Sequence, residues 1–312
     1  MNKLLIILGI GFLLITCKGD VNEEVAQKQE SQRDHRSISS DCPDFLQKRK
    51  QDNLNISILL DLSNRIELSN QQAKDSAYIS SLAKVFNTHI KNKKLGLLYD
   101  KMQVFFDPIP LDQRINKNAE LLKVSYVKGV SKDILMPETL KLYDSIPSQI
   151  YDLVRKGSKK NGYPGSDIWR FFKDHVKDYV VENCRRNVLV ILTDGYMYYD
   201  KTVMKDKNRT SFLTPQSLRK LQLNNSSWKE DLEKRNLGFI PATSNLEDLE
   251  VLVIGITDQN NENPYTPDII KTYWSRWFDE MGIKKYKIKN SDIPTNIETV
   301  IADFILNKRY GI

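Results

Sequence analysis

Histidine and cysteine are scarce in this chain of 312 residues, which contains three of each. The histidines, His35, His89 and His175, lie in no recognisable motif, and no Cys/His set has the spacing of a zinc site. A Gly-x-x-x-x-Gly-Lys phosphate loop, a Gly-x-Gly-x-x-Gly turn after a strand and a Gly-x-Ser-x-Gly elbow are also absent. These absences argue against a zinc site, nucleotide binding through a glycine-rich loop and hydrolysis by an elbow serine.

The overall composition is that of an ordinary globular protein, with 40% hydrophobic and 28% charged residues. The length fits one large domain or two modest ones, and either buries a substantial core. The net charge of +7 raises the question of an acidic partner such as nucleic acid. Basic residues are spread along the chain, so we interpret the charge as background composition and do not expect a nucleic-acid partner.

The amino terminus has the pattern of a secretory signal that ends at a cysteine. Asn2-Lys3 precedes an apolar run over residues 4–16, and Cys17 follows. Residues 14–17 resemble the lipobox of bacterial lipoproteins, although Thr16 stands where a smaller residue is usual. An uncleaved membrane anchor is the alternative, but a spanning helix needs about 20 apolar residues and this run is shorter. We therefore expect a signal peptide at 1–16, a lipid on Cys17 and a membrane-anchored protein of the bacterial cell envelope.

Residues 18–50 are polar and charged, so they cannot bury enough apolar surface to fold alone. We interpret residues 17–52 as the lipidated cysteine with a flexible tether, and residues 53–312 as the domain. If Cys17 carries lipid, Cys42 and Cys184 remain in a compartment that permits disulfides. These two cysteines either pair, which ties the leader to the domain, or stay as two free thiols.

Strands and helices alternate along the domain. The strand-like runs are 53–60, 102–106, 121–127, 187–193, 250–256 and 286–288, with 121–127 expected at an edge. Helical spacing marks 70–92, 137–155, 167–181, 267–281 and 297–306, and we expect Trp274 and Trp277 in the core. The strongest strands are continuously apolar, which favours a mainly parallel sheet covered on both faces. The sequence thus predicts an α/β fold with a doubly wound sheet of the Rossmann-like kind.

Residues 196–249 separate two core strands by more than a simple crossover requires. Because this insertion starts directly after Asp194, we expect it over the carboxyl edge of the sheet. Tyr196, Tyr198 and Tyr199 open it, and packing beneath the insertion is favoured over a binding surface, although tyrosine is common at interfaces. Its basic residues are Lys201, Lys205, Lys207, Arg209, Arg219 and Lys220.

Two apolar strands end abruptly in oxygen-bearing side chains. The run 56–60 stops at Asp61, Ser63 and Asn64, and the run 188–192 stops at Thr193-Asp194. Open α/β folds bind ligands at the carboxyl ends of their strands, so these groups are expected at one edge. Carboxylate and hydroxyl oxygens suit Mg²⁺, which keeps several waters and leaves a position for a partner's carboxylate. Taken alone, however, Asp and Ser after a strand are more often turn or cap residues.

These motifs, in this order, resemble the von Willebrand factor A family over residues 53–312. That family carries a metal-ion-dependent adhesion site built from Asp-x-Ser-x-Ser after the first strand, a Thr from a later loop and an Asp after the fourth strand. Asp61-Leu62-Ser63 matches the first motif, Gly165-Ser166-Asp167 resembles the threonine loop, and Thr193-Asp194-Gly195 matches the last. The resemblance implies Mg²⁺ ligands at Asp61, Ser63, Ser166 and Asp194, with Asn64, Arg65 and Thr193 beside the ligand. Ser166 is also placed to cap the helix that follows it.

One position departs from the family pattern, because Arg65 stands where the third residue of the first motif is Ser. Arginine has no acceptor atom and cannot bind a cation. Two alternatives follow. Either Arg65 points away and leaves a weakened Mg²⁺ site of four ligands, or its guanidinium takes the cation's place and pairs with Asp61 or Asp194.

The resemblance implies a membrane-anchored binding module that recognises a protein partner, through an acidic side chain that completes the metal shell. Two rival functions are a metal-dependent hydrolase that uses Asp61 and Asp194, and a structural component of an envelope assembly with an inert site. The hydrolase is disfavoured because no motif places a His, Lys or Cys near either aspartate, and because Arg65 lies inside the site. We therefore expect binding rather than catalysis.

Overall fold

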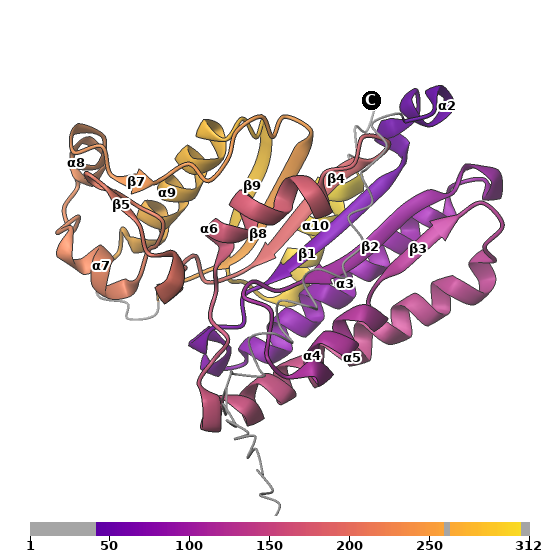
Figure 1. Ribbon diagram of the computed structural model, residues 1–312, viewed down its shortest axis with the longest axis horizontal. Coiled ribbons are helices and arrows are strands. Elements are labelled where there is room, and N and C mark those ends of the chain that lie inside the picture. The colour runs from indigo at the N-terminus through magenta and orange to yellow at the C-terminus, as the bar shows by residue number, and fades with distance from the viewer. Residues whose placement is uncertain (1–41, 259–262, 307–312) are drawn as a thin grey trace, which may run out of the picture. The chain divides into compact units, whose positions relative to one another are not determined.

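The continuously apolar runs of the sequence form the centre of a six-stranded sheet in the computed structural model, which describes residues 42–258 and 263–306 (Figure 1). The central strands β1 (Leu54–Leu60) and β4 (Arg186–Leu192) are buried along their whole length. The other strands are β2 (Tyr99–Phe105), β3 (Val124–Val127), β8 (Leu249–Ile256) and β9 (Lys285–Asn290). The expected signal peptide and Cys17 lie outside the described residues.

The strand order is β3-β2-β1-β4-β8-β9, and all neighbours run parallel except β2 and β3. The chain winds outward from β1 in one direction and from β4 in the other, which is the order of a doubly wound sheet. The prediction of fold class is therefore confirmed. Leu60 pairs with Leu192, and Leu192 with Ile254, so the carboxyl ends of three strands meet at one edge.

Helices cover both faces of the sheet and create two cores. Ile56, Ile58 and Leu60 of β1 contribute to one core, whereas Leu59 contributes to the other, because successive side chains of a strand point to opposite faces. The first core is closed by α3 (Gln71–Lys91), α4 (Gln113–Leu121), α5 (Lys132–Asn161) and α10 (Pro294–Leu306). The second core is closed by α6 (Ile168–Arg170), the π-helix η4 (Phe171–Val180) and α9 (Thr266–Glu280), with Trp274 and Trp277 fully buried as expected. None of the described helices is long and apolar enough to cross a membrane.

Some element boundaries differ from those that the sequence predicts. The predicted strand 121–127 is a strand only from Val124, because Leu121 ends α4, a helix that was not predicted. α5 continues to Asn161 through the basic segment expected to be a loop, and it contains Pro137 and Pro147. Pro147 is buried on α5, which packs against α3 and α4, so tertiary packing outweighs the hydrogen bond that proline removes.

The insertion at 196–249 forms a small sheet with two helices beside α9 (Figure 1). Phe239 packs edge-on against Tyr273, Trp274 and Trp277 of α9, so aromatic contacts fix the end of the insertion on that helix. Its first residues run along the carboxyl edge of the main sheet, where Tyr198 pairs with Ser166. The insertion contains η5 (Asp200–Thr202), β5 (Lys205–Asp206), β6 (Arg209–Thr210), α7 (Pro215–Lys220), α8 (Trp228–Lys234) and β7 (Gly238–Phe239).

A disulfide joins Cys42 to Cys184, which selects the paired alternative for these two cysteines. Residues 42–52, which the sequence assigns to the tether, carry α2 (Asp44–Gln47) and the 3-10 helix η1 (Lys50–Asp52). The Asn53 side-chain amide also donates to the Cys184 carbonyl at 3.1 Å. The segment before β1 is therefore fastened to the turn before β4, at the amino edge of the sheet.

Candidate functional site

Asp61 follows β1 directly and is buried at the carboxyl edge of the sheet, with 1% of the residue exposed. Its Oδ1 accepts the Ser63 N–H at 2.9 Å, which fixes the turn after the strand. Its Oδ2 accepts the Thr193 hydroxyl at 2.8 Å, which ties the end of β1 to the end of β4. The two strands thus hold the Asp61 carboxylate in one orientation.

Thr193 and Asp194 follow β4, and both are buried. Asp194 Oδ1 accepts the Tyr196 N–H at 3.0 Å, and Thr193 Oγ1 accepts the Gly195 N–H at 3.1 Å. Gly195 has a φ of 97°, and a Cβ atom there would lie 2.5 Å from Ile270 Cγ2. Glycine is therefore needed at this turn, which brings Asp194 to the edge beside Asp61.

The loop before α6 brings Ser166 to the same edge. Leu62 pairs with Gly165, and Ser166 pairs with Tyr198, so this loop lies between the segments that follow β1 and β4. Ser166 is 2% exposed, yet its hydroxyl has no hydrogen-bond partner among the described residues. The prediction that Ser166 caps the helix is wrong, because the Asp167 carboxylate is the cap and accepts the Arg170 N–H at 3.1 Å.

Arg65 lies in the 3-10 helix η2 (Asn64–Glu67) and is buried, with 1% exposed. Its terminal nitrogens donate to both carboxylate oxygens of Asp75 on α3, at 2.7 and 3.2 Å. Tyr151 of α5 and Gln71 of α3 each donate to the same carboxylate at 2.8 Å. The remaining nitrogen, Nε, lies 3.8 Å from Asp61 Oδ2 and has no hydrogen-bond partner among the described residues.

Arg65 and Asp75 form a buried ion pair in which each charge offsets the cost of burying the other. Burial by itself lowers the pKa of Arg65, but the charges of Asp75 and then Asp61 outweigh it and raise that pKa above its usual range. Burial raises the pKa of Asp75, and the Arg65 charge opposes the rise. Bidentate geometry with further hydrogen bonds is what makes burial of two charges tolerable. The guanidinium therefore stays charged and is directed to α3.

The position of Arg65 combines features of both sequence alternatives. Its fork points away from the edge, as the first alternative expects, while Nε stays within ion-pair distance of Asp61, as the second expects. Asp75 and Tyr151 were not predicted as part of this region. No pattern links residues 65 and 75, since they are ten positions apart on two different helices.

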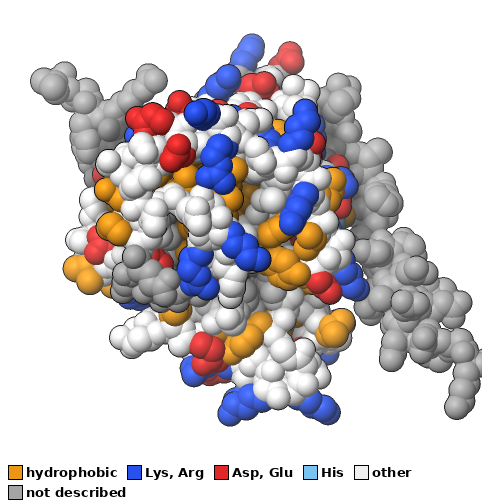
Figure 2. All heavy atoms as spheres, turned by 90° about the vertical axis from the view of Figure 1, so that its left-hand side faces the viewer, with side chains coloured by type: hydrophobic (Ala, Val, Ile, Leu, Met, Phe, Trp, Pro, Cys, Tyr) orange, Lys and Arg blue, Asp and Glu red, His pale blue; other side chains and the backbone are white. Residues whose placement is uncertain are grey.

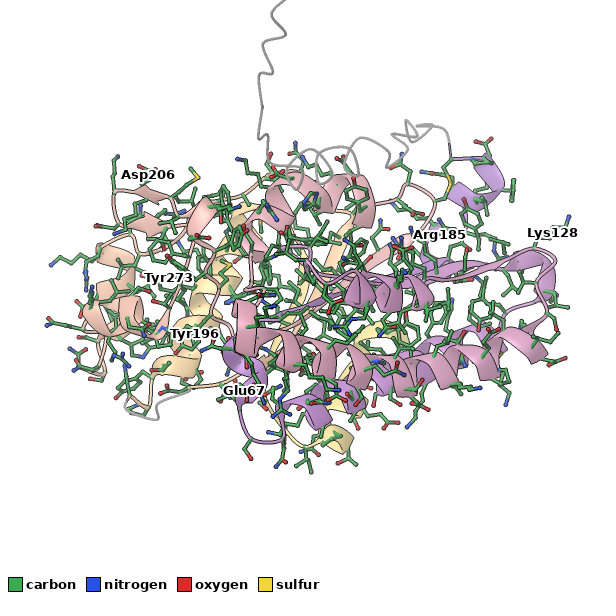
Figure 3. All side chains as sticks on the ribbon, turned by 60° about the horizontal axis from the view of Figure 1, so that its bottom comes forward. Glu67, Lys128, Arg185, Tyr196, Asp206 and Tyr273 are labelled. Carbon is green, nitrogen blue, oxygen red and sulfur yellow. A yellow bond between two sulfur atoms is a disulfide. The ribbon has the colours of Figure 1, made fainter. Side chains whose placement is uncertain are left out.

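The remaining predicted residues differ in what they offer a ligand. Ser63 is half-buried and Asn64 is exposed, so both are accessible at the edge. Thr193 is fully buried and its hydroxyl donates to Asp61, so it orients that carboxylate. In Figure 3, Glu67 and Tyr196 lie near each other towards the carboxyl edge of the main sheet, whereas Arg185 and Lys128 lie towards its amino edge.

A further buried carboxylate, Asp107, follows β2 at the same edge of the sheet. Arg170 Nε donates to its Oδ1 at 3.0 Å, and His175 Nε2 lies 3.6 Å from its Oδ2. The Asp167 N–H donates to the Asp107 carbonyl at 2.8 Å, so the end of β2 holds the loop that carries Ser166. Burial raises the pKa of Asp107 to about 6 against the opposing effect of Arg170. The rule that selected Asp61 and Asp194, a carboxylate directly after a strand, would also have found Asp107.

The donor set at the edge fits a hard cation. The charges of Asp75, Asp61 and Asp194 all raise the pKa of Arg65. Both terminal nitrogens of the Arg65 guanidinium donate to Asp75. The hydroxyls of Ser63 and Ser166 and the carboxylates of Asp61 and Asp194 are oxygen donors of the kind that Mg²⁺ takes. In the described ranges no group of three or more His, Cys, Asp or Glu residues is placed to hold a metal, so a cation here would depend on hydroxyl and water ligands as well.

Comparison with known proteins adds little to this geometry. A scan against protein-family models found no match, and a search of curated proteins found none either. Among solved structures, the chain is similar to an aerotolerance-related membrane protein from Bacteroides fragilis carrying multiple mutations to serine. The identity is 13% and the TM-score 0.35, over 82% of this chain and 100% of that one.

Two further solved structures are similar to this chain over only part of their own length. The pilus adhesin SpaC from Lactobacillus rhamnosus GG matches 82% of this chain with 10% identity and a TM-score of 0.35, over 30% of its own length. Proximal thread matrix protein 1 from the mussel byssus matches 82% of this chain with 11% identity and a TM-score of 0.33, over 46% of its own length. The chain thus spans less than half of these two proteins, and similarity at this level carries no information about the site.

Proposed function

We propose that this protein is a membrane-anchored binding module that recognises a protein partner through a divalent cation at the carboxyl edge of its sheet. The residues proposed to hold the cation are Asp61, Ser63, Ser166 and Asp194. When bound, Mg²⁺ would offer a coordination position to a carboxylate of the partner. The chain's own contribution is to hold these oxygens in place before the partner arrives.

The observation that carries the proposal is the Ser166 hydroxyl. It is buried and has no hydrogen-bond partner among the described residues, although a buried hydroxyl normally has one. The helix that follows is capped by Asp167, so the hydroxyl serves no capping role. Because Gly165 pairs with Leu62 and Ser166 with Tyr198, this oxygen lies between the segments that carry Asp61 and Asp194.

The Arg65–Asp75 pair supports the same proposal. The fork of Arg65 donates to Asp75, so its two strongest interactions are made on the α3 side. Asp61 receives only the more distant Nε, at 3.8 Å. A second positive charge at the edge would reduce the cost of burying Asp61 and Asp194 next to each other.

A binding role is favoured over catalysis by what the described side chains already do. Cys42 and Cys184 are consumed in a disulfide. His89 is 2.9 Å from Asp100, at the amino end of β2, and His175 lies beside Asp107. The two described cysteines therefore offer no free thiol as a nucleophile, and the two described histidines lie beside Asp100 and Asp107.

A thermal melt of the full chain in detergent tests the cation. Saturation at about 100 times the Kd stabilises a protein by about 2.7 kcal/mol, which corresponds to a rise in Tm of several degrees for a domain of this size. We expect added Mg²⁺ to raise the Tm of the wild type and chelator to reverse the rise. Asp194→Ala should abolish the response and Ser166→Ala should weaken it.

The matched control is Ser145→Ala, because Ser145 is an exposed serine on α5 whose hydroxyl donates only to the Lys141 carbonyl. This variant should respond to Mg²⁺ as the wild type does. A wild type that binds no Mg²⁺ by calorimetry, with an unchanged Tm, would overturn the proposed cation and leave the site inert.

A further inference from the structure

Large apolar side chains are exposed on two segments that flank the site. Twelve such side chains are exposed among the described residues, and five of them belong to residues 109–111 and 198–204. Leu111 is the most exposed of the twelve, at 90%. We call the five residues the apolar rim; they are Ile109, Leu111, Tyr198, Val203 and Met204.

Both segments are fastened to the loop that carries Ser166. Asp167 links them directly, because its N–H donates to the Asp107 carbonyl and its Oδ2 accepts the Thr202 hydroxyl at 2.8 Å. Arg170 makes a second link, because its guanidinium pairs with Asp107 and lies 5.6 Å above the Tyr199 ring. The two segments of the apolar rim are therefore both attached to the loop that carries Ser166.

The segment that contributes most of the rim, residues 198–207, carries three lysines and two exposed aspartates, Asp200 and Asp206, so it has a small excess of positive charge. Lys201, Lys205 and Lys207 are exposed, and no carboxylate of the described residues lies within ion-pair distance of their ammonium groups. Arg209, by contrast, is already paired with Glu280 at 2.6 Å. Figure 2 shows the face that includes the insertion, where Lys and Arg side chains stand between hydrophobic ones.

Leaving apolar side chains in water costs free energy, and the fold of the domain does not require this exposure. Leu111, Val203 and Met204 leave apolar surface in water, and exposed apolar groups rimmed by charge are typical of protein interaction sites. The lysines outnumber the aspartates of the same segment, so the excess positive charge favours acidic groups over basic ones. The surface is thus complementary to a segment that combines acidic and apolar side chains.

We propose that the partner binds here through an exposed segment in which Asp or Glu residues alternate with aliphatic or aromatic ones. The acidic side chains face the cation site and the three lysines, and the apolar side chains pack on the rim. This inference rests on the proposed function for the position of the cation, but the rim and the lysines are defined independently of it.

Four labelled peptides of equal length test the chemistry against the full chain by fluorescence anisotropy. The first alternates Asp/Glu with Leu/Phe; the others replace its acids by Asn/Gln, its apolar residues by Ser, or its acids by Lys. We expect the first peptide to bind at least about tenfold more tightly than each of the others, a difference of about 1.4 kcal/mol. Equal binding of all four would overturn the proposal.

Two triple variants locate the surface. Leu111→Ser/Val203→Ser/Met204→Ser removes the rim, and Lys201→Glu/Lys205→Glu/Lys207→Glu reverses its charge; all six side chains are exposed, so folding should be retained. Each variant should weaken the first peptide about tenfold or more. The matched controls change exposed residues elsewhere: Leu95→Ser/Ile134→Ser/Ile293→Ser and Lys94→Glu/Lys128→Glu/Lys141→Glu.

The Mg²⁺-dependent Tm, measured on every variant, separates this proposal from the proposed function. Loss of peptide binding with a retained Mg²⁺ response supports the rim. If the wild type binds the first peptide but does not respond to Mg²⁺, the proposed peptide surface is supported and the proposed cation is contradicted. Unchanged binding by the rim variant would overturn the rim, as would binding to phosphatidylglycerol vesicles that the two triple variants abolish while the four peptides stay indistinguishable.

Discussion

At the scale of single residues, Arg65 is the departure from the metal-site motif that removes an oxygen donor, and it is buried. Arg65 replaces a serine of the motif, and its guanidinium joins η2 to α3 and α5 through Asp75 and Tyr151. A serine side chain at this position would be too short to reach Asp75 and Tyr151. The arginine instead connects the segment after Asp61 to two helices of the first core.

We predict that Arg65→Ser destabilises the fold although it introduces the serine that the metal-site motif has at this position. It leaves the Asp75 carboxylate buried without its cation, which costs about 3–5 kcal/mol. Adding Asp75→Asn removes that buried charge while Tyr151 keeps a partner, so the double variant should recover about 1–3 kcal/mol. Urea unfolding of the wild type, both single variants and the double variant measures this coupling.

Strictly additive losses in this cycle would show that Arg65 and Asp75 do not stabilise each other. The double variant also tests the site, because it offers a third hydroxyl beside Asp61 without the guanidinium. We expect it to bind Mg²⁺ more tightly than the wild type, as measured by calorimetry. Ser145→Ala again serves as the control that changes neither quantity.

Asp107 gives a second prediction, on pH. Its pKa is raised from 3.8 to about 6 by burial, so between these values the folded state holds a proton that the unfolded chain has released. Stability therefore falls as the pH rises through this window, by on the order of 3 kcal/mol from this residue. Asp107→Asn should remove this part of the pH dependence, as seen in urea unfolding from pH 4 to pH 8.

Asp100, at the start of the same strand, provides the opposite case. It is buried, which alone would raise its pKa, but His89 and Lys93 outweigh burial and lower that pKa. Its contribution to stability is present above pH 4 and is lost as the pH falls through the lowered pKa. Asp100→Asn should therefore cost stability at neutral pH and little in acid. Parallel pH curves for the Asp107 and Asp100 variants would contradict both assignments.

The residues that could be predicted from the sequence are those whose role follows from a strand end. Asp61, Thr193 and Asp194 lie together because parallel strands in register deliver them to one edge, and the order of the motifs is enough to predict that. Asp75 could not be predicted, because its partner is chosen by the packing of α3 against η2. Ser166 lies at the edge as predicted, but the prediction that it also caps the helix is wrong, since Asp167 is the cap.

At the scale of elements, continuous apolar runs were the reliable signal. β1 and β4 are buried on both faces, so every residue must be apolar or internally bonded, and that pattern is visible in the sequence. α4, β5, β6 and β7 were missed because they are short: α4 and β5 are mostly exposed, and β7 is buried only through contacts from elsewhere in the chain. Phe239 of β7 is an example, since its position depends on three aromatic side chains of α9.

The prediction at this scale concerns the disulfide between Cys42 and Cys184. It closes a loop of 142 residues that contains β1, β2 and β3, and loop-closure entropy for that length corresponds to about 5 kcal/mol at most. Cys42→Ser/Cys184→Ser should lower the free energy of unfolding by about 2–5 kcal/mol. The unfolding of this variant in urea should be insensitive to reductant, whereas that of the wild type should be sensitive.

The expected site of loosening distinguishes this prediction from a general loss of stability. Without the disulfide, α2 keeps no buried residue to hold it, so hydrogen exchange should increase first in residues 44–52. Exchange in β1 and β4 should remain slow because both strands are buried on both faces. A reduced wild type as stable as the oxidised one would contradict the structural role of the bond.

At the scale of the whole molecule, we expect the domain and the proposed lipid anchor to have independent roles. The described residues have two hydrophobic cores and a disulfide of their own. The proposed lipid lies on Cys17, outside the described residues. Loss of the anchor should therefore change where the protein is found without changing what the domain binds.

Cys17→Ser tests this separation. The wild type, expressed in a bacterium, should incorporate labelled palmitate and enter the detergent phase on phase separation, because two or more acyl chains give stable anchoring. The variant should do neither, yet its Tm, its disulfide and its Mg²⁺ response should match those of the wild type. Cys42→Ser/Cys184→Ser is the converse control, since it should keep the label and lose stability. A Cys17→Ser protein that still carries palmitate would refute the anchor, and one that folds poorly would show that the amino-terminal segment contributes to the domain.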